Sequence, residues 1–516
     1  MINAKHINFD KTGKFPAIFL DFLCQKEALK PFSGLFPEID NYQVQLKNKK
    51  FAYRQVLYQA LNRQYDYLDK KPQLALDLLL QENTFTVTTG HQLNIFSGPL
   101  YFHYKILTVI NAAKALRKRF PTYNFVPVYW MASEDHDAQE IASFRLFGKT
   151  YTWNYEQKGA VGRFLPHSLS QVMDSVSEMH PLFRTAYQNY DSLADSTRYF
   201  VNELYGTEGL VVIDGDDKEL KNLFKEKMQS EVFGQISHKA VSEQSEKLKA
   251  AGYLAQVFPR EINLFYLDKD LRERIVPENE GFRVLNTDIF WDKAQMQAQI
   301  EQNPEKFSPN VILRPLYQET ILPNLSYTGG PGEMAYWLQL KSTFEAFQVP
   351  FPILLPRNFA LLIGNNELKK IQKFAWDNDA LFKNFAYHKE HYIRENTQQE
   401  FGLEQEIDDL KHIFEKITQK SIFVDASLEG FVKAEEQRIL ASIDKIQKRI
   451  QKAEEQKHET ALKQIENLLE KLFPNGGLQE RTDNFLNFYL NNPHFLSQIS
   501  THFDPFDFRM LLLELA

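Results

Sequence analysis

The stretch that decides the fold is residues 84–107, TFTVTTGHQLNIFSGPLYFHYKIL. Its first residues alternate threonine with apolar side chains, which predicts a β-strand that is broken at Gly90. Ser97, Gly98 and Pro99 then supply a helix-capping hydroxyl, a turn residue and a proline where an early helical position tolerates the missing N–H. We therefore predict a strand, a turn and then a helix over residues 99–119.

A second apolar stretch, residues 125–132, predicts another strand and runs into the acidic cluster Glu134-Asp135-His136-Asp137. Strand, crossover helix and strand form a βαβ unit, whose parallel sheet opens its ligand crevice at the carboxyl ends of the strands. Further candidate strands alternate with helices at residues 210–213, 262–267, 311–313 and 351–355. This alternation predicts an α/β fold with a doubly wound sheet.

Two segments are expected to border the crevice without following this pattern. Residues 151–163 resemble an antiparallel insertion, and residues 308–332 are too rich in proline and glycine to be regular.

The region after about residue 381 is rich in Glu, Lys and Gln, and its apolar residues recur at four- and three-residue spacing. The series are Leu403, Ile407, Leu410, Phe414, Ile417, then Ile439, Ile443, Ile446, Ile450, Ala453, then, after a shift, Ala461, Ile465, Leu469, Leu472. One apolar seam on each helix predicts an antiparallel coiled-coil hairpin with its turn at 418–427. The shift after Ala453 is typical of a stutter.

These patterns divide the chain into four segments. We predict a helical segment packed on the core at 1–83, the α/β core with insertions at 84–380, the coiled-coil hairpin at 381–473, and a helical tail that returns to the core at 474–516.

Composition excludes several classes of protein. The net charge of -7, from 60 basic and 67 acidic side chains, provides no positive field for nucleic acid. Cys24 is the single cysteine, so there is no internal disulfide framework or multi-cysteine metal site, and its apolar surroundings predict a packed thiol. The N-terminal sequence MINAKHINFDKTGKFP lacks the apolar core of a signal peptide, and no membrane-length apolar run follows. We expect a soluble, cytoplasmic protein.

Three groups of residues could carry chemistry. The first is Gly90-His91-Gln92 with Ser97, where a glycine lets backbone N–H groups approach an anion at the start of a helix. An ordinary capped turn, in which His91 makes structural hydrogen bonds, explains the same pattern.

The second group is the acidic cluster. Crowded like charges raise some carboxylate pKa values, which suits Asp135 or Asp137 to acid–base work, with His136 and Glu134 beside them. A solvated helix start is the alternative, because carboxylates favour helix N-termini. Adjacent side chains on a helix diverge, so we predict no metal site here.

The third group is a glycine loop, Gly329-Gly330-Pro331-Gly332, followed by Glu333, which suits close backbone approach to a ligand or a plain tight turn. Arg314 and Arg357 each follow a predicted strand, where a guanidinium could hold a carboxylate or form a structural salt bridge. Asp214-Gly215-Asp216-Asp217 is typical of an ordinary strand-to-helix loop.

Four strings together resemble a known family. TGHQLNIFSGPLYFHYKIL, PVYWMASEDHDAQEI, LRPLYQETILPNLSYTGGPGEMAYWLQL and PNGGLQER are similar to landmarks of the cysteine ligase family of bacillithiol biosynthesis, called BshC, and the match runs from about residue 84 to the C-terminus. The family usually reads Gly-Gln-Gln where this chain has Gly90-His91-Gln92.

The resemblance implies a Rossmann-like core with inserted connecting segments and a coiled coil that mediates homodimerisation. It also implies addition of L-cysteine to glucosaminyl-malate, the last step to bacillithiol. Since a carboxylate is a poor electrophile, this reaction needs activation as an acyl-adenylate or acyl-phosphate, which makes ATP with Mg²⁺ a hypothesis.

Under this resemblance, the site residues have expected roles. Gly90, Gln92, Ser97 and the following helix would face an anionic group, and Asp135, His136 or Asp137 would deprotonate the attacking amine. Arg314 or Arg357 would hold the malate carboxylates, and the glycine loop would approach substrate or nucleotide.

Two rival interpretations remain at this stage. One is another adenylate-forming or nucleotidyl-transferring enzyme, because one crevice can host many reactions. The other is a non-catalytic coiled-coil assembly protein, which would show no turnover and no sensitivity to changes in the acidic cluster.

Overall fold

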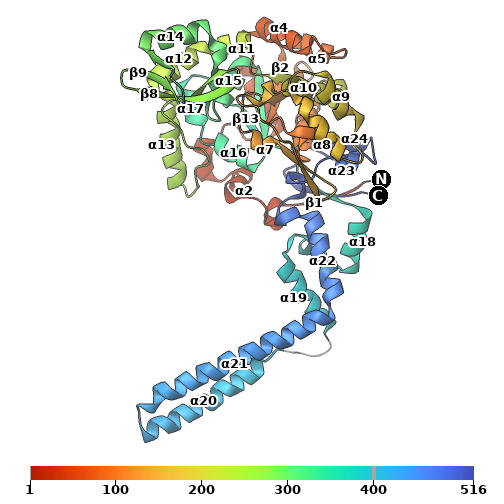
Figure 1. Ribbon diagram of the computed structural model, residues 1–516, viewed down its shortest axis with the longest axis vertical. Helices are drawn as coiled ribbons and strands as arrows, with labels where there is room; N and C mark the ends of the chain where they lie inside the picture. Colours follow the sequence, from red (N-terminus) through yellow and green to blue (C-terminus); the bar gives the residue numbers. More distant parts are fainter. Residues whose placement is uncertain (1, 398–401, 516) are drawn as a thin grey trace. The chain divides into compact units, whose positions relative to one another are not determined.

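The computed structural model describes residues 2–397 and 402–515 (Figure 1). They form two compact units, one with the residues up to Leu362 and from Leu478 onward, the other Ile363–Gly477. Among the described residues, no helix combines the length and apolar character needed to cross a membrane.

The centre of the first unit is a five-stranded sheet in which every neighbouring pair is parallel. Its order is β6 (Val211–Asp214), β3 (Asn124–Met131), β2 (Thr84–His91), β12 (Asn324–Gly329) and β13 (Ile353–Pro356). Renumbered along the chain, this is 3-2-1-4-5, the Rossmann order, so the predicted α/β class is confirmed. The order reverses between β2 and β12, where such sheets bind ligands.

Strand β2 is buried at every residue although four of its side chains are threonines. Their hydroxyls are paired across the strand boundary: Thr86 and Thr88 donate to Asn324 Oδ1 at 3.1 and 2.8 Å, and Thr89 donates to the carbonyl of Thr328 at 2.8 Å. Because buried polar groups need partners, these bonds favour β12 as the neighbour of β2.

Helix α6 (Tyr101–Arg119) follows β2 and packs along β2 and β3. The predicted capping role of Ser97 is wrong: Leu100 is the N-cap without a side-chain bond, and the Ser97 hydroxyl lies 2.8 Å from His103 Nε2 instead. Phe96, Ser97 and Gly98 all have positive φ, so the chain turns too sharply there for Ser97 to reach the helix start.

The proline-rich segment 308–332 is regular, contrary to expectation. It contains β11 (Phe307–Pro309), α15 (Leu313–Ile321), β12 and the start of α16 (Pro331–Trp337). The predicted strand at 311–313 is also wrong, because the Asn310 side chain accepts hydrogen bonds from the N–H groups of Ile312 and Leu313 and thereby starts α15. Pro315 and Pro331 fall in first helical turns, which tolerate proline.

A second five-stranded sheet is wholly antiparallel. It contains the strand expected at 262–267, which therefore does not belong to the parallel sheet. Its order is β10 (Phe290–Asp292), β9 (Gly281–Val284), β8 (Leu271–Glu278), β7 (Leu264–Asp268) and β11. Another antiparallel pair, β4 (Ser143–Leu146) with β5 (Lys149–Thr152), lies earlier than the insertion expected at 151–163.

The two chain ends meet in a third sheet, so neither terminal segment is entirely helical. Strand β1 (Asn3–Ile7) pairs antiparallel with β15 (Met510–Glu514), and β14 (Ala360–Ile363) lies beside β15. The packed thiol predicted for Cys24 is also wrong, since Cys24 follows α2 and is exposed. Other α-helices of this unit are α1 (Phe9–Thr12), α2 (Ala17–Leu23), α3 (Tyr42–Asn48), α4 (Arg54–Tyr65), α5 (Gln73–Leu78), α7 (Ala138–Ile141), α8 (Ser170–Ser175), α9 (Pro181–Asn189), α10 (Leu193–Tyr205), α11 (Lys218–Asn222), α12 (Lys225–Gly234), α13 (Ile236–Ala250), α14 (Lys293–Gln302), α17 (Lys341–Ala346), α23 (Leu486–Tyr489) and α24 (Phe495–Ser500).

The second unit is helical. Helices α20 (Glu404–Val424) and α21 (Leu428–Lys457) run side by side as the coiled-coil hairpin (Figure 1), with a turn shorter than the predicted 418–427. The shift after Ala453 marks a helix end rather than a stutter, because the chain breaks at His458 before α22 (Glu459–Leu472). Helix α22 packs on α19 (Phe385–Asn396) through Ile393, Leu462 and Ile465, and α18 (Asn365–Lys373) precedes them.

Candidate functional site

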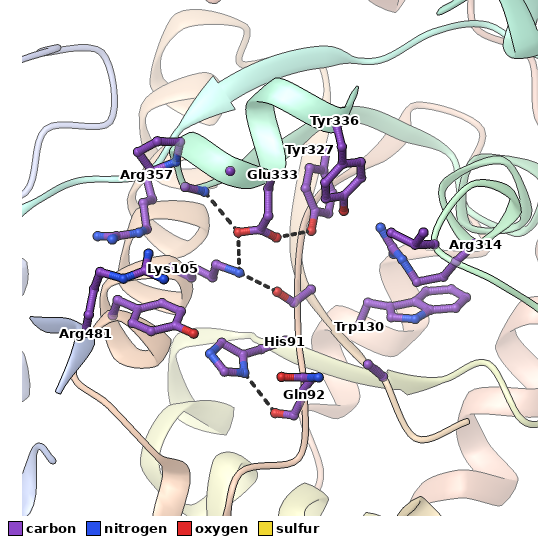
Figure 2. A pocket seen from close by; sticks show the side chains of 17 residues that line it. His91, Gln92, Lys105, Trp130, Arg314, Tyr327, Glu333, Tyr336, Arg357 and Arg481 are labelled. Atoms are coloured by element: carbon purple, nitrogen blue, oxygen red, sulfur yellow. Dashed lines mark hydrogen bonds and ion pairs between the residues drawn. The ribbon is translucent and has the colours of Figure 1, made fainter. Parts of the chain in front are cut away.

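A cavity of about 400 Å³ lies at the point where the strand order reverses, and we call it the switch-point chamber (Figure 2). Its lining comes from β2, β3 and β12, from α6, α15 and α16, and from segments beside them and later in the chain: Gly90, His91, Gln92, Tyr101, Lys105, Trp130, Ala132, Val311, Arg314, Tyr327, Gly330, Pro331, Gly332, Glu333, Tyr336, Arg357, Arg481. Gly90 permits close packing here, since a Cβ on it would lie 3.2 Å from the Tyr327 hydroxyl.

A partly buried ion pair joins the two helices that follow β2 and β12. Lys105 Nζ lies 2.6 Å from Glu333 Oε2 and donates to the carbonyl oxygen of Gly90 at 2.8 Å (Figure 2). Glu333 also accepts hydrogen bonds from the hydroxyl of Tyr327 at 2.6 Å and from the N–H of Gly330 at 3.0 Å. Burial favours a higher pKa for Glu333, but the charge of Lys105 and these bonds outweigh it, so the pKa lies below its usual value.

Arg357 is nearly inaccessible, 2% exposed, and forms an ion pair with Glu480, which is fully buried. Glu480 also accepts a hydrogen bond from the N–H of Ala360 at 3.3 Å, and the Arg357 guanidinium lies 3.9 Å from the centre of the Phe359 ring. The fold has therefore already compensated the charge of Arg357, although its Nε has no hydrogen-bond partner among the described residues.

Arg314 differs from Arg357 in this respect. Its Nη1 donates to Gln318 Oε1 at 3.0 Å, Tyr336 is a further hydrogen-bond partner, and the guanidinium lies between the rings of Tyr327 and Trp130 at 5.5 and 5.9 Å. In the part of the chain that the structure describes, no carboxylate pairs with Arg314, and its buried Nη2 has no partner. It is a fixed cation without a direct ion pair among the described residues, and Glu333 is the nearby negative charge.

His91 is a neutral acceptor in this chamber. Its Nδ1 lies 2.9 Å from the carbonyl oxygen of Gln92, so the bond requires the proton on Nδ1 and leaves a lone pair on Nε2. Burial, and then the charge of Lys105, lower the pKa of His91 to about 3. The buried Nε2 has no partner within the described residues.

A second cavity, of about 470 Å³, lies between the end of β3 and the antiparallel sheet, and we call it the second chamber. Asp135, His136 and Glu134 line one side, and Arg272 and Arg274 of β8 line another. The residues it shares with the switch-point chamber are Trp130, Ala132, Val311 and Arg314. The two chambers therefore lie side by side in one cleft region and share part of a wall.

The acidic cluster is paired rather than free. Glu134 forms an ion pair with the fully buried Lys221. Asp135 accepts hydrogen bonds from Gln92 Nε2 at 3.0 Å and from the N–H of His136 at 2.8 Å. Arg272 Nη1 lies 2.6 Å from His136 Nδ1 and 3.8 Å from Asp135 Oδ1. Asp137 is exposed and lines neither chamber.

The expectation that crowding raises a carboxylate pKa in this cluster is wrong for Asp135. Burial favours a higher pKa there, but the hydrogen bond from Gln92 and the charge of Arg272 prevail and lower it. Burial, and then Arg272, also lower the pKa of His136. The carboxyl whose pKa is raised, to about 6, is Asp214 of the loop that looked ordinary, through burial and the neighbouring charge of Asp216.

Two predicted binding residues lie outside both chambers. Ser97 is buried against His103, and Gly329 lies against Glu333, where a Cβ would come within 2.9 Å of the Glu333 Cβ. The N–H of Gly330 is already used by Glu333, so the glycine loop offers a ligand less backbone than its sequence indicates.

Several chamber residues were missed from the sequence: Tyr101, Lys105, Trp130, Tyr327, Tyr336, Arg272 and Arg481. Tyr101 and Lys105 carry a usable signal, because residues four apart share a helix face and this helix follows the glycine turn. Arg272 has no such signal, since the antiparallel sheet brings it to the end of β3. Among residues 2–397 and 402–515, no group of three or more His, Cys, Asp or Glu side chains could hold a metal ion.

Comparison with known proteins gives matches over nearly the whole chain. A family model described as "Bacillithiol biosynthesis BshC, N-terminal Rossmann-like domain" matches residues 2–358, and one described as "Bacillithiol biosynthesis BshC, C-terminal coiled-coil domain" matches residues 360–515. Proteins from Flavobacterium psychrophilum and Flavobacterium johnsoniae are 42% and 41% identical, over 97% and 94% of both chains. One from Cytophaga hutchinsonii is 37% identical over 98% of both chains. Each is named "Putative cysteine ligase BshC".

Proposed function

The chain belongs to the BshC family of bacillithiol biosynthesis, and from this premise we propose that it is a ligase that joins L-cysteine to glucosaminyl-malate in the last step of that pathway. An amide bond would form between the carboxyl carbon of cysteine and the amine nitrogen of the glucosamine. The amine loses a proton, and one carboxyl oxygen leaves with the group that activated it.

The observation that carries this proposal is the two-chambered cleft at the switch point of the parallel sheet. A ligase must hold two substrates side by side, and the cleft offers two adjoining cavities of about 400 and 470 Å³. The switch-point chamber has four cationic side chains, Lys105, Arg314, Arg357 and Arg481, against one carboxylate, Glu333. This excess of positive charge favours an acidic substrate such as the malate end of glucosaminyl-malate.

Within this scheme, Arg314 or Arg357 holds the malate carboxylates, with Gly90, His91, Gln92 and Gly330 lining the same chamber. Asp135 is the proposed proton acceptor for the attacking amine, because its carboxylate borders the second chamber. His136 accepts a hydrogen bond from Arg272, which suits it to positioning that arginine.

ATP with Mg²⁺ is the proposed source of activation, and it would supply the leaving group that a free carboxylate lacks. Arg260 and Arg272 line the second chamber, and their guanidinium groups fit a phosphate-bearing group while Arg314 or Arg357 holds the malate carboxylates.

The deciding experiment is mass spectrometry of the purified protein incubated with glucosaminyl-malate and cysteine, with and without ATP and Mg²⁺. We expect bacillithiol only in the complete mixture. Product formed without ATP would support the ligase function and contradict the proposed role of ATP. Absence of product in every mixture, with turnover of another acid and amine pair, would favour an enzyme of a different pathway. Absence of any turnover would favour a non-catalytic assembly protein.

We also propose that the protein is a cytoplasmic homodimer that associates through the hairpin. Several apolar side chains on α20 and α21 are exposed, among them Ile413, Ile417, Ile439 and Ile446 at 53, 42, 39 and 52%. Exposed apolar side chains on both helices of a coiled-coil hairpin favour pairing with a second copy. Light scattering should give twice the chain mass for the wild type and the single chain mass for Ile439→Lys/Ile446→Lys. A dimeric double variant would contradict the hairpin interface.

A further inference from the structure

Among the residues that the two chambers share, Arg314 is the one with a charge. We propose, building on the ligase function above, that the cleft holds two ligands at once and that Arg314 contacts both. An acid with two carboxylates occupies the switch-point chamber, and an amino acid, cysteine in the proposed reaction, occupies the second chamber.

The switch-point chamber suits a di-acid because of how its charges are distributed. Glu333 compensates Lys105 at 2.6 Å, and Glu480 compensates Arg357 behind the chamber wall. Arg314 and Arg481 remain without a carboxylate in the part of the chain that the structure describes. Two guanidinium groups in one cavity that lack a direct ion pair among the described residues match two carboxylates of a small ligand.

The second chamber has a different composition, with both signs of charge beside an apolar wall. Asp135 and Arg274 provide opposite charges, and Ile262, Leu264 and Phe265 provide the apolar side. A zwitterion with a small, weakly polar side chain satisfies all three features, because its ammonium, carboxylate and side chain each find a matching surface. Cysteine has this chemistry.

Arg314 is held so that it can contact both chambers. Its Nη1 is bonded to Gln318, whose Nε2 donates to Glu319 Oε1 at 3.0 Å, and Glu319 is in turn 3.3 Å from the buried Lys49. This buried network fixes one edge of the guanidinium and leaves Nη2 unpartnered. A planar group with several N–H donors can serve two anions at once.

This position also assigns Arg314 a role in bond formation. The carboxyl of an amino acid beside Arg314 is brought to the boundary between the chambers, where the amine of the other substrate must arrive. When the amine nitrogen attacks the activated carboxyl carbon, the electron pair of the C=O bond moves to its oxygen. A fixed guanidinium stabilises that charge.

The test is isothermal titration of the full-length protein with two probes, succinate for the di-acid and L-cysteine for the amino acid. Arg481→Met, which changes the switch-point chamber alone, should weaken succinate, and Arg274→Met, which changes the second chamber alone, should weaken cysteine. Arg314→Met should weaken both by about tenfold or more, as expected for loss of a hydrogen bond to a charged group. Arg314→Lys, which retains the charge, should recover part of both affinities.

An effect of Arg314→Met on one probe only, competition between succinate and cysteine for the wild type, or no binding of either at millimolar concentrations would each overturn the proposal. Thermal melting of each variant establishes that it is folded. The ligase proposal fails separately: independent binding of both probes, with loss of both in Arg314→Met but no bacillithiol from the wild type, would retain the two-ligand cleft and reject the reaction.

Discussion

Polar residues follow both β2 and β3 in the sequence, but the two groups differ in how far the rest of the protein supplies their partners. At the end of β3, the acidic cluster is paired: Glu134 with Lys221, Asp135 with Gln92 and Arg272, and His136 with Arg272. The switch-point chamber at the end of β2, by contrast, is lined by three residues with buried polar atoms that have no partner among the described residues: His91 Nε2, Arg314 Nη2 and Arg357 Nε.

The difference teaches that a dense run of charge is not by itself a sign of reactive groups. Charged residues that are adjacent in sequence can find partners on another sheet, as Asp135 and His136 do with Arg272 of the antiparallel sheet. The pKa values of both Asp135 and His136 are then lowered, away from neutrality. A buried polar atom without a protein partner needs water or a ligand to complete its hydrogen bonds, and three such atoms gathered around one cavity favour a polar ligand there.

The largest expected effect is a loss of stability when the buried ion pair between Arg357 and Glu480 is broken. Arg357→Met leaves Glu480 buried without its cation, so we expect the free energy of unfolding to fall by about 3–5 kcal/mol. Arg314→Met is the matched control, because it removes a guanidinium with no carboxylate partner and should cost much less. Urea denaturation followed by tryptophan fluorescence measures both. Equal losses would mean that Arg314 is as fully paired in solution as Arg357.

The next prediction tests whether the acidic cluster takes part in the reaction although its charges are paired. If Asp135 accepts the proton of the amine, Asp135→Asn should lower product formation about 10²-fold or more. Asp137→Asn is the neighbouring control, since Asp137 is exposed outside both chambers, and it should retain nearly wild-type turnover. Unchanged product formation in both Asp135→Asn and His136→Ala would remove acid–base chemistry from this cluster and leave it a positioning role.

The sequence predicts the βαβ unit well because its signals are local. Alternation in β2, the glycine that follows, and the apolar run of β3 each specify an element, and the position of ligand crevices at strand ends follows from the topology. His91, Gln92, Glu333 and Arg357 were thereby expected near one crevice, and the structure brings them together.

What the sequence does not reveal is pairing between distant segments. Arg272 reaches Asp135 only because an antiparallel sheet packs over the end of β3, and Glu480 reaches Arg357 only because the chain returns after the coiled-coil unit. The same limitation explains the errors at 308–332 and at Ser97. Proline there marks first helical turns rather than irregular chain, and the Ser97 hydroxyl finds a buried histidine instead of the helix start.

The smallest effect concerns His91, which stays neutral in the folded protein because burial lowers its pKa. Its pKa is about 3 in the folded protein and about 6.5 in an unfolded chain, so below pH 6.5 the unfolded state binds a proton that the folded state does not. Stability is therefore lost as the pH falls, and at pH 5 this histidine alone should lower the free energy of unfolding by about 2 kcal/mol relative to pH 8. His91→Gln has no such proton, so its loss between pH 8 and pH 5 should be smaller by that amount, while the two proteins stay close at pH 8. Denaturation curves that shift in parallel with pH would show that His91 is protonated in the folded state, and the unpartnered acceptor would then disappear from the switch-point chamber.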